Sequence, residues 1–265
     1  MYFRSLMKLL KNFLFITFFS TAAQTTVTTE FLNKEILKVD DIVALNNFGF
    51  KYLINGNAFI LQKKDESLEY SNVQFGTITT TNAFNPLKIN LFYKDFNTAI
   101  ILDNRLAEIF KIDFNTIQPY KNVSRISTGY DNTLWIFNQD SQQLELYDYK
   151  ANITRVKTLP IQGNILDMKS SYNYCWLLTE KFLFVYNYFG SLIKKIKNDG
   201  FTEMAESNEN LILKKDGKLF YLEKDTVTPI PISISNLLIN RFLVTNETLY
   251  IYDHVYLHEF KLKTN

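Results

Sequence analysis

Residues 131–149, DNTLWIFNQDSQQLELYDY, hold a polar corner, an apolar and aromatic strand, a polar turn and a second strand. The same layout recurs in FNTAIILDNRLAEIFKIDF (96–114), NYCWLLTEKFLFVYNY (173–188), NENLILKKDGKLFYLEKD (208–225) and NETLYIYDHVYLHEFKL (246–262), and more weakly in FKYLINGNAFILQKKD (50–65). Equivalent positions are Leu53, Ile100, Trp135, Trp176, Ile212 and Tyr250, which lie roughly 35 to 47 residues apart. This period is typical of β-propeller blades.

Short alternating strands flank each hairpin, as VSRISTGY (123–130) and ITRVKTLP (153–160) do around the opening stretch. Four short strands per unit predict an all-β propeller with six four-stranded blades of about 40 residues each. The final unit lacks a fourth strand, and TTVTTEFLNKEI (25–36) is left over. We expect this N-terminal strand to lie beside 256–263 and close the last blade. A β-sandwich and an open β-solenoid remain the alternatives.

The composition agrees with a β-protein. Aromatic residues make up 15% of the 265 residues, with 16 Tyr and 23 Phe, and such side chains suit pleated surfaces. Gly and Pro are scarce, at 8 and 5. We therefore expect Asn and Asp, which tolerate the left-handed conformation, to form most turns.

The first residues have the order of a secretory signal peptide. Basic residues at positions 4, 8 and 11 precede the apolar run 13–19, and small residues follow at 20–23. We predict a signal peptide over 1–23 and a single propeller domain over 24–265, with an uncleaved membrane anchor as the alternative. The first 23 residues hold three of the 29 basic residues and none of the 27 acidic ones, so the remainder is nearly neutral. This balance argues against nucleic-acid binding and against direct membrane insertion.

Few residues suggest chemistry. Cys175, the only cysteine, is read as a buried apolar residue rather than a catalytic thiol. His254 and His258 fall on one face of a strand, but no further His or Cys cluster accompanies them, so neither a metal nor another cofactor is predicted. Nucleophile motifs are absent, so no catalytic residue is assigned and the chain is not expected to be an enzyme. Polar residues expected to line the central channel are Asp95, Tyr130, Lys169 and Glu206.

One segment exceeds a minimal blade: FGTITTTNAFNPLKI, residues 75–89. It is Thr-rich and nearly uncharged, and loops on rigid β-scaffolds commonly carry function. The alternative is a lengthened first strand of the second blade. The residues predicted to bind a partner are Phe75, Thr79, Thr80, Thr81, Asn82, Phe84 and Pro86.

The blade phrase of residues 131–149, the short signal ending in Ala-Gln and the composition rich in Asn, Lys, Ile and Phe resemble exported propellers of the Bacteroidota, in particular plug subunits of type IX secretion translocons. The resemblance implies a periplasmic, non-enzymatic interaction protein, monomeric within a hetero-complex. It would bind and occlude the periplasmic opening of a large outer-membrane β-barrel. The Asp-Thr-Val at 225–227 resembles an O-glycosylation pattern of that phylum, which implies Thr226 as a modified residue.

Two other functions remain open from the residues alone. One is a periplasmic propeller that binds a glycan or peptide in an axial pocket, or acts as a sensor or scaffold. The other is a hydrolase or lyase, which would need clustered carboxylates or histidines on the same scaffold. The repeat does not separate them, since a fold does not determine a function.

Overall fold

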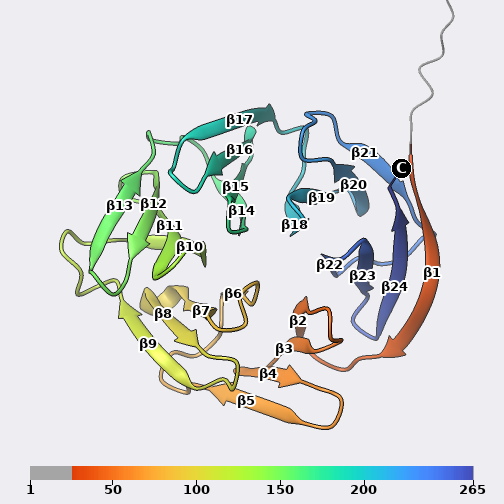
Figure 1. Ribbon diagram of the computed structural model, residues 1–265, viewed down its shortest axis with the longest axis horizontal. Coiled ribbons are helices and arrows are strands. Elements are labelled where there is room, and N and C mark those ends of the chain that lie inside the picture. The colour runs from red at the N-terminus through yellow and green to blue at the C-terminus, as the bar shows by residue number, and fades with distance from the viewer. Residues whose placement is uncertain (1–25, 265) are drawn as a thin grey trace, which may run out of the picture.

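Each repeated hairpin forms the two middle strands of an antiparallel sheet, and the flanking strands complete it, in a computed structural model that describes residues 26–264 (Figure 1). Four separate sheets have four strands each. The first is β2 (Asp41–Leu45), β3 (Lys51–Asn55), β4 (Ala58–Gln62) and β5 (Ser67–Ser71). The second is β6 (Thr80–Asn82), β7 (Ile89–Tyr93), β8 (Thr98–Leu102) and β9 (Glu108–Asp113). The third is β10 (Val123–Thr128), β11 (Thr133–Asn138), β12 (Gln143–Asp148) and β13 (Ile153–Lys157). The fourth is β14 (Ile165–Ser170), β15 (Tyr174–Thr179), β16 (Phe182–Asn187) and β17 (Leu192–Lys197).

The remaining eight strands form one continuous sheet in the order β18-β19-β20-β21-β1-β24-β23-β22. Its strands are β18 (Glu203–Ser207), β19 (Asn210–Lys215), β20 (Lys218–Leu222), β21 (Ile230–Ser233), β1 (Val27–Ile36), β24 (Tyr256–Lys263), β23 (Thr248–Tyr252) and β22 (Arg241–Thr245). The expected all-β propeller is thus confirmed, but the prediction of six separate four-stranded blades is wrong.

The eight-stranded sheet arises because β1 uses both of its edges. It pairs antiparallel with β24 from Thr28↔Lys263 to Ile36↔Tyr256, as expected for the closing strand. Its first residues also pair in parallel with β21, at Val27↔Ile232 and Thr28↔Ser233. A free strand edge carries unpaired N–H and C=O groups, and β21 is positioned to satisfy them.

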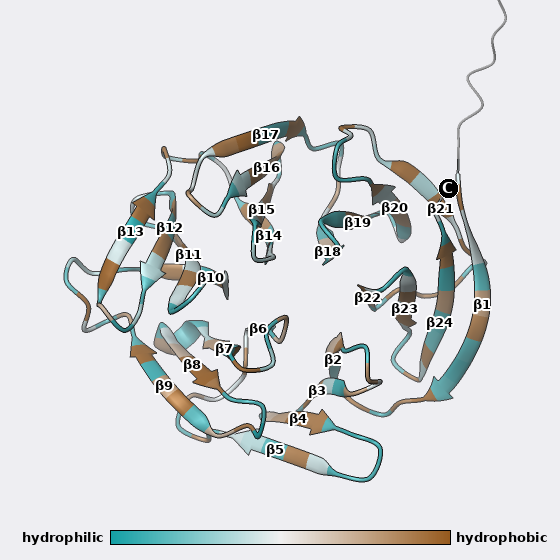
Figure 2. Cartoon of the chain, in the orientation of Figure 1, coloured by the Kyte–Doolittle hydropathy of each residue, from teal (hydrophilic) through white to brown (hydrophobic). Residues whose placement is uncertain are grey.

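The middle strands are buried on both faces because neighbouring sheets cover them. Every residue of β8 and β11 is buried, whereas the outer strands β5 and β13 alternate between exposed and half-buried positions. Six clusters of buried apolar side chains lie between successive four-strand groups around the ring. In Figure 2 the strands carry both apolar and hydrophilic colour, whereas the loop between β4 and β5 is hydrophilic. The core is therefore spread around the ring rather than gathered at its centre.

Turn chemistry follows the scarcity of glycine. Of the eleven non-glycine residues with positive φ within residues 26–264, six are Asn or Asp: Asn97, Asp131, Asn152, Asn208, Asp216 and Asn246. Seven of the eight glycines also have positive φ, so Asn and Asp form many of these turns but not most of them. The one helix within residues 26–264 is a single 3-10 turn, η1 (Lys94–Phe96), and no helix in this part of the chain has the length and apolarity to cross a bilayer. The predicted signal peptide lies outside the described residues.

Candidate functional site

A cavity of about 460 Å³ is lined largely by residues of the inner strands and their loops. Figure 1 shows these strands nearest the centre of the ring. Residues from β2, β6, β14, β18 and β22, and from the loops that follow them, line the cavity wall. The lining includes Lys169 and Glu206, as the sequence predicted. Asp95 lies instead in η1, and Tyr130 lies in the turn after β10, so neither contributes to the wall.

Aromatic side chains gather in the loops at this end of the inner strands. Phe48 follows β2 and is 83% exposed, and Phe84 follows β6; both line the cavity. Tyr172, in the loop after β14, meets Phe84 edge to face with 4.7 Å between ring centroids. Tyr188 packs against Tyr130 at 5.9 Å. We call Phe48, Phe84 and Tyr172 the aromatic rim, because exposed aromatic rings on rigid loops are effective contact groups for ligands.

The structure divides the segment 75–89 into two parts. Thr81, Asn82, Phe84 and Pro86 line the cavity. Phe75 packs away from it, with its ring 5.3 Å from Tyr93 and 5.6 Å from Phe96. The Thr79 hydroxyl accepts the Lys94 N–H at 3.1 Å, and the Thr80 hydroxyl is buried without a partner among the described residues. The alternative of a lengthened first strand does not hold, because β6 has only three residues and a loop follows it; the partner contact stays a prediction.

Lys88, which the sequence analysis missed, fixes this loop in place. Its buried ammonium donates hydrogen bonds to the carbonyl oxygens of Gly129 at 2.6 Å, Asp131 at 2.7 Å and Thr133 at 3.3 Å. Burial lowers the pKa of Lys88 to about 8, against an opposing effect of the Asp131 carboxylate. A lysine before an apolar strand carries no sequence signal for such a role, since most lysines there are solvated.

Glu206 lies near the end of β18 in the cavity wall. One oxygen of its carboxylate accepts the Glu209 N–H at 2.8 Å. Burial raises the pKa of Glu206 to about 7; the Glu209 charge acts in the same direction, and the hydrogen bond acts against it. Lys169, on the neighbouring inner strand β14, has its Nζ 3.3 Å from Oδ1 of Asp167. The cavity therefore holds a weakly compensated carboxylate.

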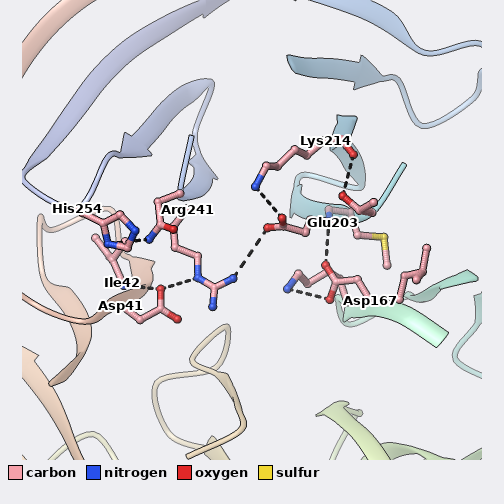
Figure 3. Close-up of polar contacts among 12 residues, drawn as sticks. Asp41, Ile42, Asp167, Glu203, Lys214, Arg241 and His254 are labelled. Carbon is pink, nitrogen blue, oxygen red and sulfur yellow. Dashed lines mark hydrogen bonds and ion pairs between the residues drawn. The ribbon is translucent and has the colours of Figure 1, made fainter. Parts of the chain in front are cut away.

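A network of charged side chains connects the inner strands near their first residues, at the end away from the aromatic rim (Figure 3). Arg241 on β22 donates to Asp41 on β2 at 2.7 Å and lies 3.9 Å from Glu203 on β18, which also pairs with Lys214 at 2.7 Å. Asp167 on β14 accepts the Met204 N–H at 2.9 Å. Because these carboxylates already have hydrogen-bond donors, we interpret the network as structural: it holds neighbouring inner strands together.

The remaining candidate residues are apart from the cavity. His258 pairs with Asp253 at 2.8 Å, while His254 faces Asn240 at 3.3 Å. Within residues 26–264, no three His, Cys, Asp or Glu side chains gather as a metal site. Cys175 is fully buried, which raises the pKa of its thiol well above the ordinary value. Thr226 borders a separate groove of about 60 Å³, and its hydroxyl donates to the Glu223 carbonyl at 2.9 Å.

Comparison with solved structures identifies the class of architecture. Virginiamycin B lyase from Staphylococcus aureus matches with a TM-score of 0.57 and 11% identity, over 88% of this chain and 100% of that one. BamB from Moraxella catarrhalis matches with a TM-score of 0.51 and 12% identity, over 89% and 98%. A chain of the mitotic checkpoint complex matches with a TM-score of 0.58 and 8% identity, over 89% and 96%. At these identities the likeness shows the propeller fold alone. No protein-family model and no curated protein sequence matches the chain.

These neighbours correct one prediction. The absence of nucleophile motifs led to the expectation that the chain is not an enzyme, but a lyase is among the structures that share its fold. The exclusion was drawn from short motifs that belong to other folds, so it does not transfer to a propeller.

Proposed function

We propose that this protein binds a segment of a partner polypeptide at the face where the axial cavity and the aromatic rim lie. The observation that carries the proposal is the cavity itself: its volume of about 460 Å³ can hold side chains, and exposed aromatic rings border it. Large exposed apolar side chains gathered at one place commonly mark an interaction site. The rigid ring beneath them lowers the entropic cost of binding.

The partner that the sequence resemblance favours is the periplasmic opening of a large outer-membrane β-barrel. We therefore extend the proposal to an exported protein that occludes a type IX secretion translocon as part of a hetero-complex. What supports this extension is the likeness of the blade phrases, together with a disc-shaped, nearly neutral molecule that suits a wide opening. The polypeptide-binding proposal does not depend on it.

The first prediction is tested by affinity capture from the native cell envelope with a tagged full-length protein, followed by mass spectrometry. We expect near-stoichiometric recovery of one partner protein. We expect Phe84→Ala, which removes a rim side chain, to reduce recovery at least about tenfold, as loss of a hot-spot aromatic does. The matched control is Ile109→Ala, which trims a side chain that is 51% exposed on the outer strand β9.

The outcomes separate the two parts of the proposal. Recovery of a giant barrel protein supports both, and recovery of another protein contradicts the barrel. Equal recovery by Phe84→Ala and wild type, with both folded by circular dichroism, contradicts the cavity face as the binding site. Absence of any polypeptide, with saturable binding of an oligosaccharide, contradicts polypeptide binding altogether.

A further inference from the structure

Glu206 differs from the other acidic groups around the axis because it has no cationic partner. Asp41 and Glu203 pair with Arg241 and Lys214, and Asp167 pairs with Lys169. Across residues 26–264, no lysine, arginine or histidine forms an ion pair with Glu206. Its only hydrogen bond in this range comes from the Glu209 N–H, at 2.8 Å.

The cavity wall that holds this carboxylate is only partly polar. Met204, Ala205 and Phe242 are buried and belong to the same cavity wall. A half-buried carboxylate loses part of its hydration, and its ionised form then costs free energy unless a positive charge or hydrogen-bond donors compensate it. A ligand that brings a positive charge into the cavity would offset that cost.

We propose that Glu206 binds a lysine or arginine side chain of the partner segment. This inference rests on the proposed function and specifies the chemistry of its ligand. The aromatic rim favours the same ligand, because the faces of aromatic rings attract ammonium and guanidinium groups. Phe84 and Phe48 line the same cavity as Glu206, so one basic side chain in this cavity has both kinds of contact group available to it.

Neighbouring charges permit this arrangement. Lys169 is the only lysine or arginine that lines the cavity, and it pairs with Asp167 on its own strand. Lys214 on β19 and Arg241 on β22, which belong to elements packed against β18, lie outside the cavity lining. Glu209, on the same hairpin as Glu206, adds negative charge and itself pairs with Lys224. The charged residues of the cavity lining are thus one carboxylate, Glu206, and one ammonium, Lys169, which is already paired with Asp167.

The second prediction is a titration of the purified protein with the capped peptides Ac-Ala-Ala-X-Ala-Ala-amide, followed by amide chemical shifts in NMR spectra. At pH 8 we expect X = Lys or Arg to bind at least about tenfold more tightly than X = Gln, as a charge-assisted contact does. Binding should move the resonances of β18 and of the loop after β6. Because burial raises the pKa of Glu206 to about 7, the preference for Lys should fall as the pH drops from 8 to 5.5.

Two variants complete the test. Glu206→Gln keeps an acceptor for the Glu209 N–H and should abolish both the preference for Lys and its pH dependence. The control Glu69→Gln removes an exposed carboxylate on the outer strand β5 and should change neither. Equal binding of the Lys and Gln peptides, or an unchanged preference in Glu206→Gln, overturns the assignment.

Envelope capture separates this inference from the proposed function. If wild type and Glu206→Gln recover the partner equally while Phe84→Ala does not, the binding face stands and the role of Glu206 is wrong. If Phe84→Ala also recovers it equally, the proposed binding face fails as well. If Glu206→Gln fails to capture the partner and wild type prefers the Lys peptide to the Gln peptide, both the binding face and the role of Glu206 are supported.

Discussion

Lys121 and Glu145 form an ion pair in the third sheet, with side chains only 3% and 1% exposed. Glu145 also accepts hydrogen bonds from Asn138 at 3.1 Å and Thr154 at 3.0 Å. Burial raises the pKa of Glu145, but the hydrogen bond and charge of Lys121 and the hydrogen bonds from Asn138 and Thr154 together lower it overall. Such a pair is stable only while both partners are present, because either one alone is a buried charge.

The third prediction follows from this pair. Lys121→Met should lower the free energy of unfolding by about 3 to 5 kcal/mol at pH 7, since it leaves the Glu145 carboxylate buried and uncompensated. Lys121→Met combined with Glu145→Gln removes both charges and keeps an acceptor for Asn138 and Thr154, so it should recover much of the loss. Urea denaturation followed by circular dichroism measures both. A double variant no more stable than the single one would show that the charge is not the cause.

Residue-scale roles were the hardest to predict from the sequence. Lys169 and Glu206 were expected at the axis because they fall on inner strands, and the structure places them there. Asp95 was misplaced because it sits in η1, between the two middle strands of its sheet. The anchoring by Lys88 depends on carbonyl groups some forty residues later in the chain, and no local pattern encodes such a contact.

Among the elements, β1 has the most consequential position. Its first residue, Val27, is 4% exposed and belongs to the apolar cluster shared with Ile232 and Leu262. Farther along the strand, Leu32 is 47% exposed and lies at a bulge between Phe31 and Asn33. Substitutions at these two positions of β1 should therefore differ in their effect on the free energy of unfolding.

The fourth prediction compares these two sites. Val27→Asp places an unpaired charge in the cluster and should cost at least about 3 kcal/mol of unfolding free energy. Leu32→Asp, on the same strand, should change it by less than about 1 kcal/mol. Thermal denaturation of both variants gives the comparison. Similar melting temperatures for the two would mean that β1 is not needed to close the ring.

At the level of elements, the sequence was informative where local patterns suffice. The middle hairpins, the turns at Asn and Asp, and the pairing of β1 with β24 were all expected and are present. The parallel contact between β1 and β21 was not expected, because it joins strands from two different repeats. That contact merges two groups of strands, and a repeat count cannot show it.

Seen as a whole molecule, the ring brings the two ends of the described chain together. Thr28 pairs with Lys263 in the closing strands. The loop at 63–66 between β4 and β5 is exposed and makes only a local ion pair, Lys63 with Glu66 at 2.7 Å. The ring therefore depends on which strands lie side by side, and the chain ends could be moved to another exposed loop without changing that arrangement.

The fifth prediction is a circular permutant of residues 26–264. Joining Thr264 to Thr26 through a short Gly-Ser linker and opening the chain at Asp65 should preserve the β-sheet spectrum and a cooperative melt. The control opens the chain at Trp135, which is 1% exposed within β11, and should not fold. If the Asp65 permutant is unfolded while the linker length is sufficient, the closure described here is not the one that the protein forms.

The closing strands also set an order of events in biogenesis. β1 is made early, yet both of its partners, β21 and β24, come from the last part of the chain. While synthesis is under way, β1 has neither partner, and its unpaired edges are open to non-native contacts. Closure joins residues far apart in sequence, which slows folding. A chain whose last strands have not yet been synthesised therefore cannot complete this fold, and β1 stays unpaired until β21 and β24 are available.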